Sequence, residues 1–373
     1  MPTTADTPAH GPRPAGRAPR LWFVGALPPP LNGQSNCNRA MLDALRARGA
    51  DIRLHDIGGS TASKLSGVAR AIAAILRRGR RGDRAYLSVP GQMGAWLFVP
   101  LARALRWRGI DHVVHHHSFR AINLGPLAAM RRLVAAGGDR QRHLLLSAAM
   151  RRRFAELYLP HAPERAESLS NAHLFGPRTD SPTTRPDRPV TLGHLSVLTR
   201  EKGVSHLLRL FEAMMARGHD GRLVIAGPCA DPTLAEELTR AASAHPGRIE
   251  WRGAVAGQDK ERFFRDIDLF VLPTTLIDEA EPLVMLEAYG KGVDVVANDT
   301  GCIRDRIRTP GHLLPRDIEG DCRVIAARIG ENAADWSAAR AACIDHVRAI
   351  KAMADAEAET FFARLLGGTA PGS

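Results

Sequence analysis

Two glutamates, Glu279 and Glu287, stand eight positions apart in the stretch LPTTLIDEAEPLVMLEAYGKG, residues 272–292. The stretch is typical of the end of a buried strand, then a loop holding several carboxylates, then a helix that begins near Leu283. The two carboxylates can therefore face a polyhydroxylated ligand from different directions. The helix start leaves the N–H groups of Leu283 and Val284 without intrahelical partners, and the helix dipole there favours an anion. The pattern indicates a site for a phosphorylated sugar, with an exposed helix residue and a solvated loop as the alternative interpretation.

A lysine that can also take part in this chemistry lies in the stretch SVLTREKG, residues 196–203. This stretch joins a predicted strand to the helix that follows it. Lys202 can reach into a cleft from there and neutralise a departing diphosphate, the kind of electrostatic stabilisation that usually dominates transfer chemistry. A surface lysine without a function is the alternative.

A glycine also lies at a strand-to-helix junction in the stretch PPPLNGQS, residues 28–35. Gly33 and the amides after it can approach a phosphate closely. The stretch is not G-x-G-x-x-G, and no acid lies about twenty residues on in the expected setting, which disfavours a dinucleotide site. A plain turn is the alternative.

Three consecutive histidines, His115 to His117, end another predicted strand. Alternate side chains of a strand point to opposite faces, so the three imidazoles cannot all bind one metal. His115 and His117 share a face, but no further Asp, Glu or Cys is spaced to complete a metal site. We predict no metal and no cofactor, and histidines that only pack or face solvent are the alternative to a functional role.

The elements that must position these residues follow a repeating pattern. Short apolar runs alternate with helix-period segments from Leu21 onward, which predicts an α/β protein built of parallel βαβ units. The first series has strands beginning near Leu21, Ile52, Ala85, His112 and His143, with helices over residues 35–48, 65–78, 94–107 and 126–136. The second has strands beginning near Val190, Arg222, Arg248, Asp268 and Val293, with helices over residues 204–217, 232–245, 259–267 and 283–291.

A Pro-rich stretch without apolar periodicity separates the two series and predicts a linker. The predicted organisation is a disordered tail (residues 1–20), a first domain that binds the acceptor (21–175), the linker (176–189), a second domain that binds the donor (190–345) and a C-terminal helix that can pack back on the first domain (346–373). Two doubly wound halves place a cleft between the carboxyl edges of their sheets, where ligands bind in such folds.

The positive charge of the chain belongs to its first half. Residues 1–175 carry 26 Lys and Arg against 10 Asp and Glu, a net charge of +16, whereas residues 176–373 carry 25 against 29, a net charge of −4. A one-sided positive field attracts phosphate-bearing substrates, nucleic acid or an acidic membrane surface. The aromatic share of 5% argues against a stacking platform for single-stranded nucleic acid.

Arginines of the first half form clusters at predicted helix ends beside Leu, Ile, Trp and Phe. Such clusters suit an interface with anionic lipid, and a solvated Arg-rich face is the alternative. The clusters are Arg77, Arg78, Arg80 and Arg81; Arg103, Arg106 and Arg108; Arg131 and Arg132; and Arg151 to Arg153. The longest apolar run, residues 93–102, is shorter than the ~18 residues that span a bilayer. We therefore expect at most a peripheral membrane contact.

The five cysteines are odd in number, scattered and without C-x-x-C spacing, which fits a reducing cytoplasm and gives no zinc site. The first twenty residues lack an apolar segment, so we expect a disordered tail there and not a signal peptide. The expected location is the cytoplasm, with a peripheral contact at the inner face of the plasma membrane.

Taken in order from about Leu21 to Ile307, these segments resemble the group 1 (family 4) retaining glycosyltransferases. Glu279 and Glu287 are similar to the E-x7-E motif of that family, residues 28–35 to its P-P-x-x-G-Q-S loop, and Lys202 with the following glycine to the end of its G-R-L-x-x-x-K-G motif. The resemblance implies the GT-B fold, in which two Rossmann-like doubly wound domains face each other across a cleft.

The resemblance also implies roles for individual residues. Glu279 would hydrogen-bond the donor sugar, Glu287 would hold the ribose, and the amides of Leu283 and Val284 would meet the diphosphate and sugar. Lys202 would stabilise the departing diphosphate.

On the other side of the cleft, the resemblance gives His117 the contact with the reacting sugar, with His115 as second choice. Gly33 would lie between donor and acceptor. Gly227 and Val255 fall where the family houses the nucleoside, and the glycine at position 301 matches its following loop.

Three positions depart from the family pattern. Glu281 stands where the family more often has Phe or another uncharged residue, which would put a third carboxylate close to the sugar pocket. Val197 stands at the Arg position of the Lys202 motif, so either Arg200 supplies the missing charge or Lys202 acts alone. Residues 266–268 resemble the D-x-D manganese motif of the other large transferase fold, but they straddle a helix end and a strand start, which predicts a structural role for Asp268.

From these residues we predict a metal-independent, retaining hexosyltransferase without a cofactor. It would move a sugar from a UDP- or GDP-sugar to a glycan or polyprenyl-phosphate-linked acceptor in surface polysaccharide biosynthesis, and would not bind nucleic acid. A nucleotide-sugar epimerase or phosphorylase-like enzyme of the same fold is one alternative. The others are a nucleic-acid-binding protein that uses the basic half and an inactive glycan-binding scaffold, which Val197 would favour.

Overall fold

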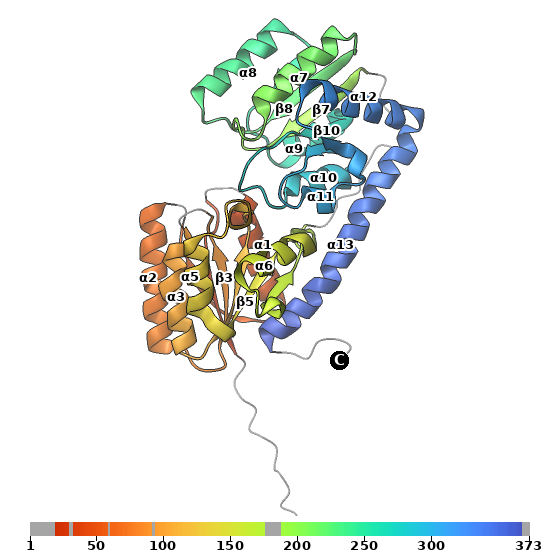
Figure 1. Cartoon of the computed structure of the whole chain (residues 1–373). Helices are drawn as coiled ribbons and strands as arrows, with labels where there is room; N and C mark the ends of the chain where they lie inside the picture. Colours follow the sequence, from red (N-terminus) through yellow and green to blue (C-terminus); the bar gives the residue numbers. More distant parts are fainter. Residues whose placement is uncertain (1–18, 30–32, 59, 92–93, 176–187, 368–373) are drawn as a thin grey trace, which may run out of the picture.

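The computed structural model describes residues 19–29, 33–58, 60–91, 94–175 and 188–367 of the 373-residue chain. Most of the expected N-terminal tail, most of the predicted linker and part of the PPPLNGQS stretch therefore lie outside the described residues. Within them the chain forms two parallel sheets, each covered by helices (Figure 1), as the alternating pattern predicts. No described helix is long and apolar enough to cross a membrane.

The first sheet has the strand order β2-β1-β3-β4-β5-β6. Its strands are β1 (Arg20–Gly25), β2 (Asp51–Asp56), β3 (Arg84–Val89), β4 (Asp111–His116), β5 (Gln141–Leu145) and β6 (Ala166–Ser168). The helices of this first domain are α1 (Gly33–Ala47), α2 (Thr61–Arg78), α3 (Gly94–Trp107), α4 (Arg120–Asn123), α5 (Ala128–Gly137) and α6 (Ala148–Tyr158). Strands β1, β3 and β4 are buried at five of their six positions because helices cover both faces of a parallel sheet.

The second sheet has the strand order β12-β11-β10-β7-β8-β9. Its strands are β7 (Val190–Leu195), β8 (Gly221–Ala226), β9 (Ile249–Trp251), β10 (Leu269–Leu272), β11 (Asp294–Asn298) and β12 (Leu313–Leu314). The helices of this second domain are α7 (Val204–Ala216), α8 (Pro232–Ala244), α9 (Gly257–Asp266), α10 (Leu283–Gly290), α11 (Ile303–Arg306) and α12 (Ile318–Ala334).

Strand order reverses at one place in each sheet. In the first sheet the reversal lies between β1 and β3, and in the second between β7 and β10. Loops that leave the carboxyl ends of such neighbouring strands turn to opposite sides of the sheet and leave a crevice, where ligands bind in open α/β folds. The stretches that contain Lys202 and Glu279 are the two loops at the second reversal.

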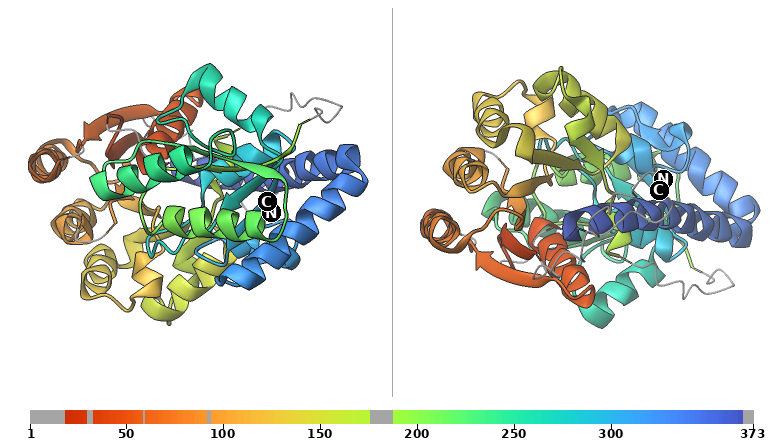
Figure 2. Two further views of the ribbon diagram at one scale, coloured as in Figure 1. Left: turned by 90° about the horizontal axis from the view of Figure 1, so that it is seen from above. Right: turned by 90° about the horizontal axis from the view of Figure 1, so that it is seen from below.

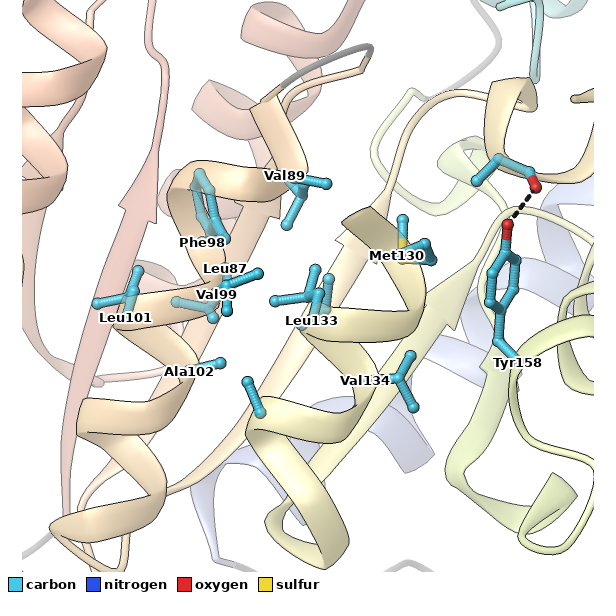
Figure 3. Packing of buried hydrophobic residues seen from close by; sticks show 14 of the residues in the cluster. Leu87, Val89, Phe98, Val99, Leu101, Ala102, Met130, Leu133, Val134 and Tyr158 are labelled. Atoms are coloured by element: carbon cyan, nitrogen blue, oxygen red, sulfur yellow. Dashed lines mark hydrogen bonds between the residues drawn. The ribbon is translucent and has the colours of Figure 1, made fainter. Parts of the chain in front are cut away.

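Packing of α3 and α5 holds the carboxyl ends of β3 and β4 in place (Figure 3). Phe98 of α3 and Leu133 of α5 lie over Leu87 of β3, and all three are fully buried. On the α6 side of the same core, the Tyr158 hydroxyl donates to the Ala121 carbonyl at 2.6 Å. The segment that follows β4 thus rests on a packed core.

A single long helix, α13 (Trp336–Leu366), joins the domains. Its first half packs in the core of the second domain through Val347 and Ile350. Its last turns pack against the first sheet, where Phe362 belongs to the same cluster as Phe23. Figures 1 and 2 show the helix running along the side of both domains. The expected helix boundary at residue 346 falls inside α13.

Candidate active site

Lys202 and Glu279 meet at the reversal point of the second sheet. The Lys202 Nζ donates to Glu279 Oε2 at 2.6 Å, and the Thr274 hydroxyl donates to the same oxygen at 3.0 Å. The two charged side chains are 18% and 9% exposed. Two of the three predicted catalytic residues are therefore in direct contact, in a partly buried ion pair.

Two glycines allow the loops around this pair to pack closely. Gly203 has φ +81°, and a Cβ there would lie 2.2 Å from the carbonyl oxygen of Pro273. Gly301 has φ +61°, and a Cβ there would lie 2.3 Å from the carbonyl oxygen of Glu279. Both positions need the left-handed region and leave no room for a side chain. The backbone on either side of Glu279 is thus fixed by neighbours that only glycine permits.

Helix α10 begins directly after this loop. Pro282 caps it in an extended conformation, and Leu283 and Val284 form its first turn, half-buried. The first N–H groups of a helix have no partner inside it, and the dipole leaves a partial positive charge there. Lys202 and the start of α10 therefore provide positive potential close to the carboxylate of Glu279.

Glu287 lies further along α10 and has its own cationic partner. Lys260 of α9 donates from Nζ to Glu287 Oε1 at 2.7 Å, and the two side chains are about one third exposed. The sequence did not single out Lys260, because a lysine in an amphipathic helix carries no motif. Glu287 remains the predicted ribose ligand.

Glu281 does not offer a free carboxylate to a sugar pocket, in contrast to the expectation. Its Oε1 accepts from the Ser170 hydroxyl and its Oε2 from the Asn171 N–H, both at 2.6 Å. The Arg306 guanidinium binds the same carboxylate and donates to the Leu146 carbonyl at 2.7 Å. Residue 281 thus joins the second domain to the first, a contact over more than a hundred residues that no local pattern predicts.

Arg200, the predicted alternative source of the charge missing at Val197, pairs with acidic side chains of the second domain in the structure. Val197 is 52% exposed. The Arg200 guanidinium lies 3.5 Å from Asp231 and 3.7 Å from Glu237, at the start of α8. Among the described residues, the cation that contacts Glu279 is Lys202.

The histidines at the end of β4 point alternately to two sides. His116 Nε2 lies 3.0 Å from His143 Nδ1, whereas the rings of His115 and His117 lie 4.0 Å apart, centre to centre. Burial raises the pKa of Tyr86 well above its ordinary value, and its hydroxyl lies within hydrogen-bond distance of His115 Nδ1, at 2.5 Å. No group of three or more metal-binding side chains occurs in the described part of the chain.

His117 is the histidine with a free hydrogen-bonding atom next to a hollow. Burial lowers its pKa to about 4, so its ring is neutral at pH 7. Its Nε2 is buried and has no hydrogen-bond partner among the described residues. The hollow lies between His117, Arg120 and the apolar side chains of Val89 and Met130. A neutral imidazole there can accept or donate one hydrogen bond to a ligand.

The site residues predicted in the two domains are linked by a contact between their chain neighbours. Ser118 follows His117, Asp278 precedes Glu279, and the Ser118 hydroxyl donates to Asp278 Oδ1 at 2.9 Å. The groups on the first and second sheets therefore face the same interface between the domains.

The other predicted donor residues lie at the carboxyl edges of the sheets. Gly33 starts α1, where a Cβ would meet no atom within 4 Å. The Gly227 N–H, after β8, donates to the Gly253 carbonyl at 2.6 Å, and Val255 is half-buried before α9. This contact joins the loops that follow β8 and β9, and Val255 lies two residues beyond Gly253.

Asp268 has the structural role predicted for it. It precedes β10, accepts from the Thr191 N–H at 2.8 Å and binds the Arg188 guanidinium at 2.7 Å. Its carboxylate holds the start of β7 against β10.

Comparison with known proteins gives two kinds of match. The family model described as glycosyl transferases group 1 matches residues 189–331. Among curated proteins, a glycogen synthase of Thioalkalivibrio sulfidiphilus (strain HL-EbGR7) is 28% identical over 133 residues. That match covers 35% of this chain and 26% of the synthase, so the chain spans about a quarter of the length of this relative.

Solved structures match over most of the chain. Anabaena Alr3699/HepE in complex with UDP has a TM-score of 0.64 at 16% identity and covers 90% of this chain and 95% of its own. Sucrose-phosphate synthase of Thermosynechococcus elongatus has 0.69 at 15%, covering 93% and 99%. The catalytic domain of starch synthase IV of Arabidopsis thaliana, bound to ADP and acarbose, has 0.66 at 12%, covering 94% and 100%. These similarities establish the GT-B fold, and over residues 189–331 the chain matches the model of the predicted family, the group 1 glycosyltransferases.

Proposed function

We propose that this protein is a retaining, metal-independent glycosyltransferase that uses a nucleoside diphosphate sugar as donor. The observation that carries the proposal is the partly buried ion pair of Lys202 and Glu279 beside the start of α10, at the reversal point of the second sheet. In this arrangement a cation and a helix N-terminus face a diphosphate, while a carboxylate faces sugar hydroxyls.

The donor binds to the second domain. Lys202 exchanges its contact with Glu279 for the diphosphate, and the released carboxylate accepts hydrogen bonds from the sugar. The amides of Leu283 and Val284 bind the diphosphate, and Glu287 binds the ribose. A UDP- or GDP-sugar is the proposed donor, and two of the similar structures, solved with UDP and with ADP, support a nucleoside diphosphate.

In the transfer step, the bond between the anomeric carbon and the diphosphate oxygen breaks, and both electrons leave with the diphosphate. The acceptor hydroxyl oxygen forms the new bond to that carbon on the face that the diphosphate leaves. Its proton passes to the departing phosphate. Neutral His117 orients the sugar by a hydrogen bond from its unpaired Nε2.

The acceptor binds to the first domain, and a glycan on a polyprenyl phosphate fits the positive charge there. This role places the protein in surface polysaccharide biosynthesis, in the cytoplasm and in peripheral contact with anionic lipid. Trp107 at the end of α3 is 74% exposed and has the Arg108 guanidinium 5.9 Å from its ring centre. A ring and a guanidinium together suit a lipid headgroup interface.

A thermal-shift screen against UDP-, GDP- and ADP-sugars tests the donor, because a ligand that binds only the folded state raises Tm in relation to its affinity. We expect one base and one sugar to give the largest rise, and the Lys202→Ala variant to lose it. Absence of any rise with every nucleotide sugar would contradict the proposal. Incubation with labelled donor alone then separates transfer from epimerisation, because an epimerase changes the sugar without an acceptor.

A further inference from the structure

The loop between β10 and α10, residues 273–282, binds the first domain at its tip. The Asp278 carboxylate accepts from the Ser118 hydroxyl at 2.9 Å and from the Arg120 guanidinium at 3.3 Å. The Asp278 carbonyl accepts from the Phe119 N–H at 3.3 Å, and the Asn123 amide donates to the Ile277 carbonyl at 2.9 Å. Four hydrogen bonds thus join the tip of this loop to the segment that follows His117.

The same loop binds the first domain again three residues later, through Glu281. This second contact is buried, with the Glu281 and Arg306 side chains 0% and 12% exposed. The contact at Asp278 is more exposed, with the Asp278 and Arg120 side chains 25% and 32% exposed. Separating a buried charge from its partners is costly, whereas solvent replaces an exposed pair at little cost. The two contacts therefore differ in how readily they open.

Glu279 lies between these two contacts in sequence. It is the chain neighbour of Asp278, just as His117 is the chain neighbour of Ser118. The Ser118 to Asp278 hydrogen bond therefore fixes where the predicted acceptor-side and donor-side groups stand relative to each other.

We propose that Asp278 is a positioning residue for sugar transfer. Its contact with Ser118 and Arg120 can be released, and when formed it sets the position of His117 relative to Glu279. Glu281 forms the permanent contact about which the domains open. This inference rests on the proposed function. When the tip contact opens, a donor and an acceptor can enter. When it closes, His117 and Glu279 are held in the positions that transfer requires. An error of about 1 Å in such an arrangement lowers the rate by about 100-fold.

The test compares Asp278→Ala, Asp278→Asn and Ser118→Ala with the matched control Asp345→Asn, whose carboxylate is 74% exposed on α13. We expect Asp278→Ala to lower kcat by about 10- to 100-fold. The donor KM stays within about twofold of the unchanged protein, because the donor contacts are intact. Asp278→Asn keeps an acceptor for Ser118, so it recovers part of the loss. The double variant of Ser118→Ala and Asp278→Ala is no worse than the poorer single one.

A purely structural role for Asp278 would give a different result. In that case Tm and kcat would fall together, or kcat would match the Asp345→Asn control, and either outcome overturns the proposal. The contrasting variant is Glu281→Gln, which removes the buried charge beside Arg306. We expect it to lower Tm more than any variant at position 278.

Small-angle X-ray scattering of the donor-free protein gives a readout that needs no activity. Opening of the tip contact predicts a larger radius of gyration for Asp278→Ala than for the unchanged chain and for Asp345→Asn. If the unchanged protein transfers no sugar, the proposed function fails, yet this comparison still decides whether residue 278 holds the domains together. Equal radii for all three proteins overturn the releasable contact.

Discussion

Lys202 Nζ lies 2.6 Å from Glu279 Oε2 although 77 residues separate the two in sequence. The contact exists because β7 and β10 are neighbours in the sheet, with Leu192 beside Leu269 and Gly193 beside Phe270. Loops that leave the same end of two adjacent parallel strands must start close together, about 5 Å apart. The pairing of Lys202 with Glu279, the proposed phosphate-binding cation and sugar-orienting carboxylate, therefore follows from strand order.

Replacement of Lys202 by alanine should abolish donor-dependent stabilisation. It removes the cation that meets the diphosphate, so we expect kcat to fall by about 100- to 1,000-fold. Single-turnover measurements with a labelled donor check this loss. The control is Lys351→Ala, which removes a lysine paired with Asp355 on α13, far from the sheet reversal, and should keep full activity. Equal activities of the two variants would contradict the role given to Lys202.

Glu287→Gln should weaken donor binding without slowing the chemical step. A neutral amide accepts weaker hydrogen bonds from a ribose than a carboxylate does, so the donor KM should rise about 10-fold at unchanged kcat. Initial rates over a range of donor concentrations measure both constants. The control is Glu236→Gln on the exposed face of α8. A fall in kcat at constant KM would place Glu287 at the reacting centre instead of at the ribose.

Two glycine variants separate backbone strain from a steric clash. Gly247 has φ +74° with nothing within 4 Å of a Cβ, whereas Gly203 has a similar φ and a carbonyl oxygen 2.2 Å away. Gly247→Ala should cost about 1–2 kcal/mol, which is the strain alone. Gly203→Ala should cost more and also reduce transfer, because its Cβ pushes the loop that carries Glu279. Urea unfolding and kcat are the measurements, and equal costs would show that the loops are not tightly packed.

The rate of transfer should not depend on the titration of His117 between pH 5.5 and 8. Burial lowers the pKa of this histidine to about 4, so its ring stays neutral over that range. His117→Asn should lower kcat by removing a hydrogen bond, and should leave the shape of the pH profile unchanged. If the pH profile of kcat had a limb with a pKa between 6 and 7, and this limb disappeared in His117→Asn, His117 would act as a general base.

Folding stability should fall as the pH is lowered from about 6.5 toward 4. Burial lowers the pKa of a group of histidines in the folded protein, whereas in the unfolded chain they titrate near 6.5, so the unfolded state gains protons first. Stability is therefore complete above pH 6.5 and is lost progressively as the pH falls below it. The group is His112, His115, His116, His117, His143, His173 and His194.

Urea unfolding at pH 7.5, 6.5 and 5.5 measures this dependence. His143→Asn removes one fully buried histidine and should make the dependence on pH shallower. His161→Asn, at an exposed position, should leave the dependence unchanged. A pH dependence that is the same in all three proteins would contradict the assignment to buried histidines.

Local patterns in the sequence predicted most of the strands and helices near the site. Helix α3 has the predicted bounds, 94–107, and α10 begins at the predicted Leu283. Strands buried on both faces are short continuous apolar runs, and their turns carry glycine and proline, so both are visible in a single chain. The strands β6 and β12 were not predicted, because three and two residues are too few to show a period.

The sequence by itself determined which residues stand at the ends of strands and at the start of α10, and therefore that Lys202 and Glu279 belong to loops and Glu287 to a helix. Only the tertiary structure decided which partner each charge takes. Glu281 binds Ser170, and Arg200 turns to Asp231. Local spacing governs secondary structure because its hydrogen bonds and side-chain periods are short-range. The pairing of charges depends instead on strand order and on how two domains meet, which bring together residues as far apart in sequence as Arg48 and Glu359, 311 positions.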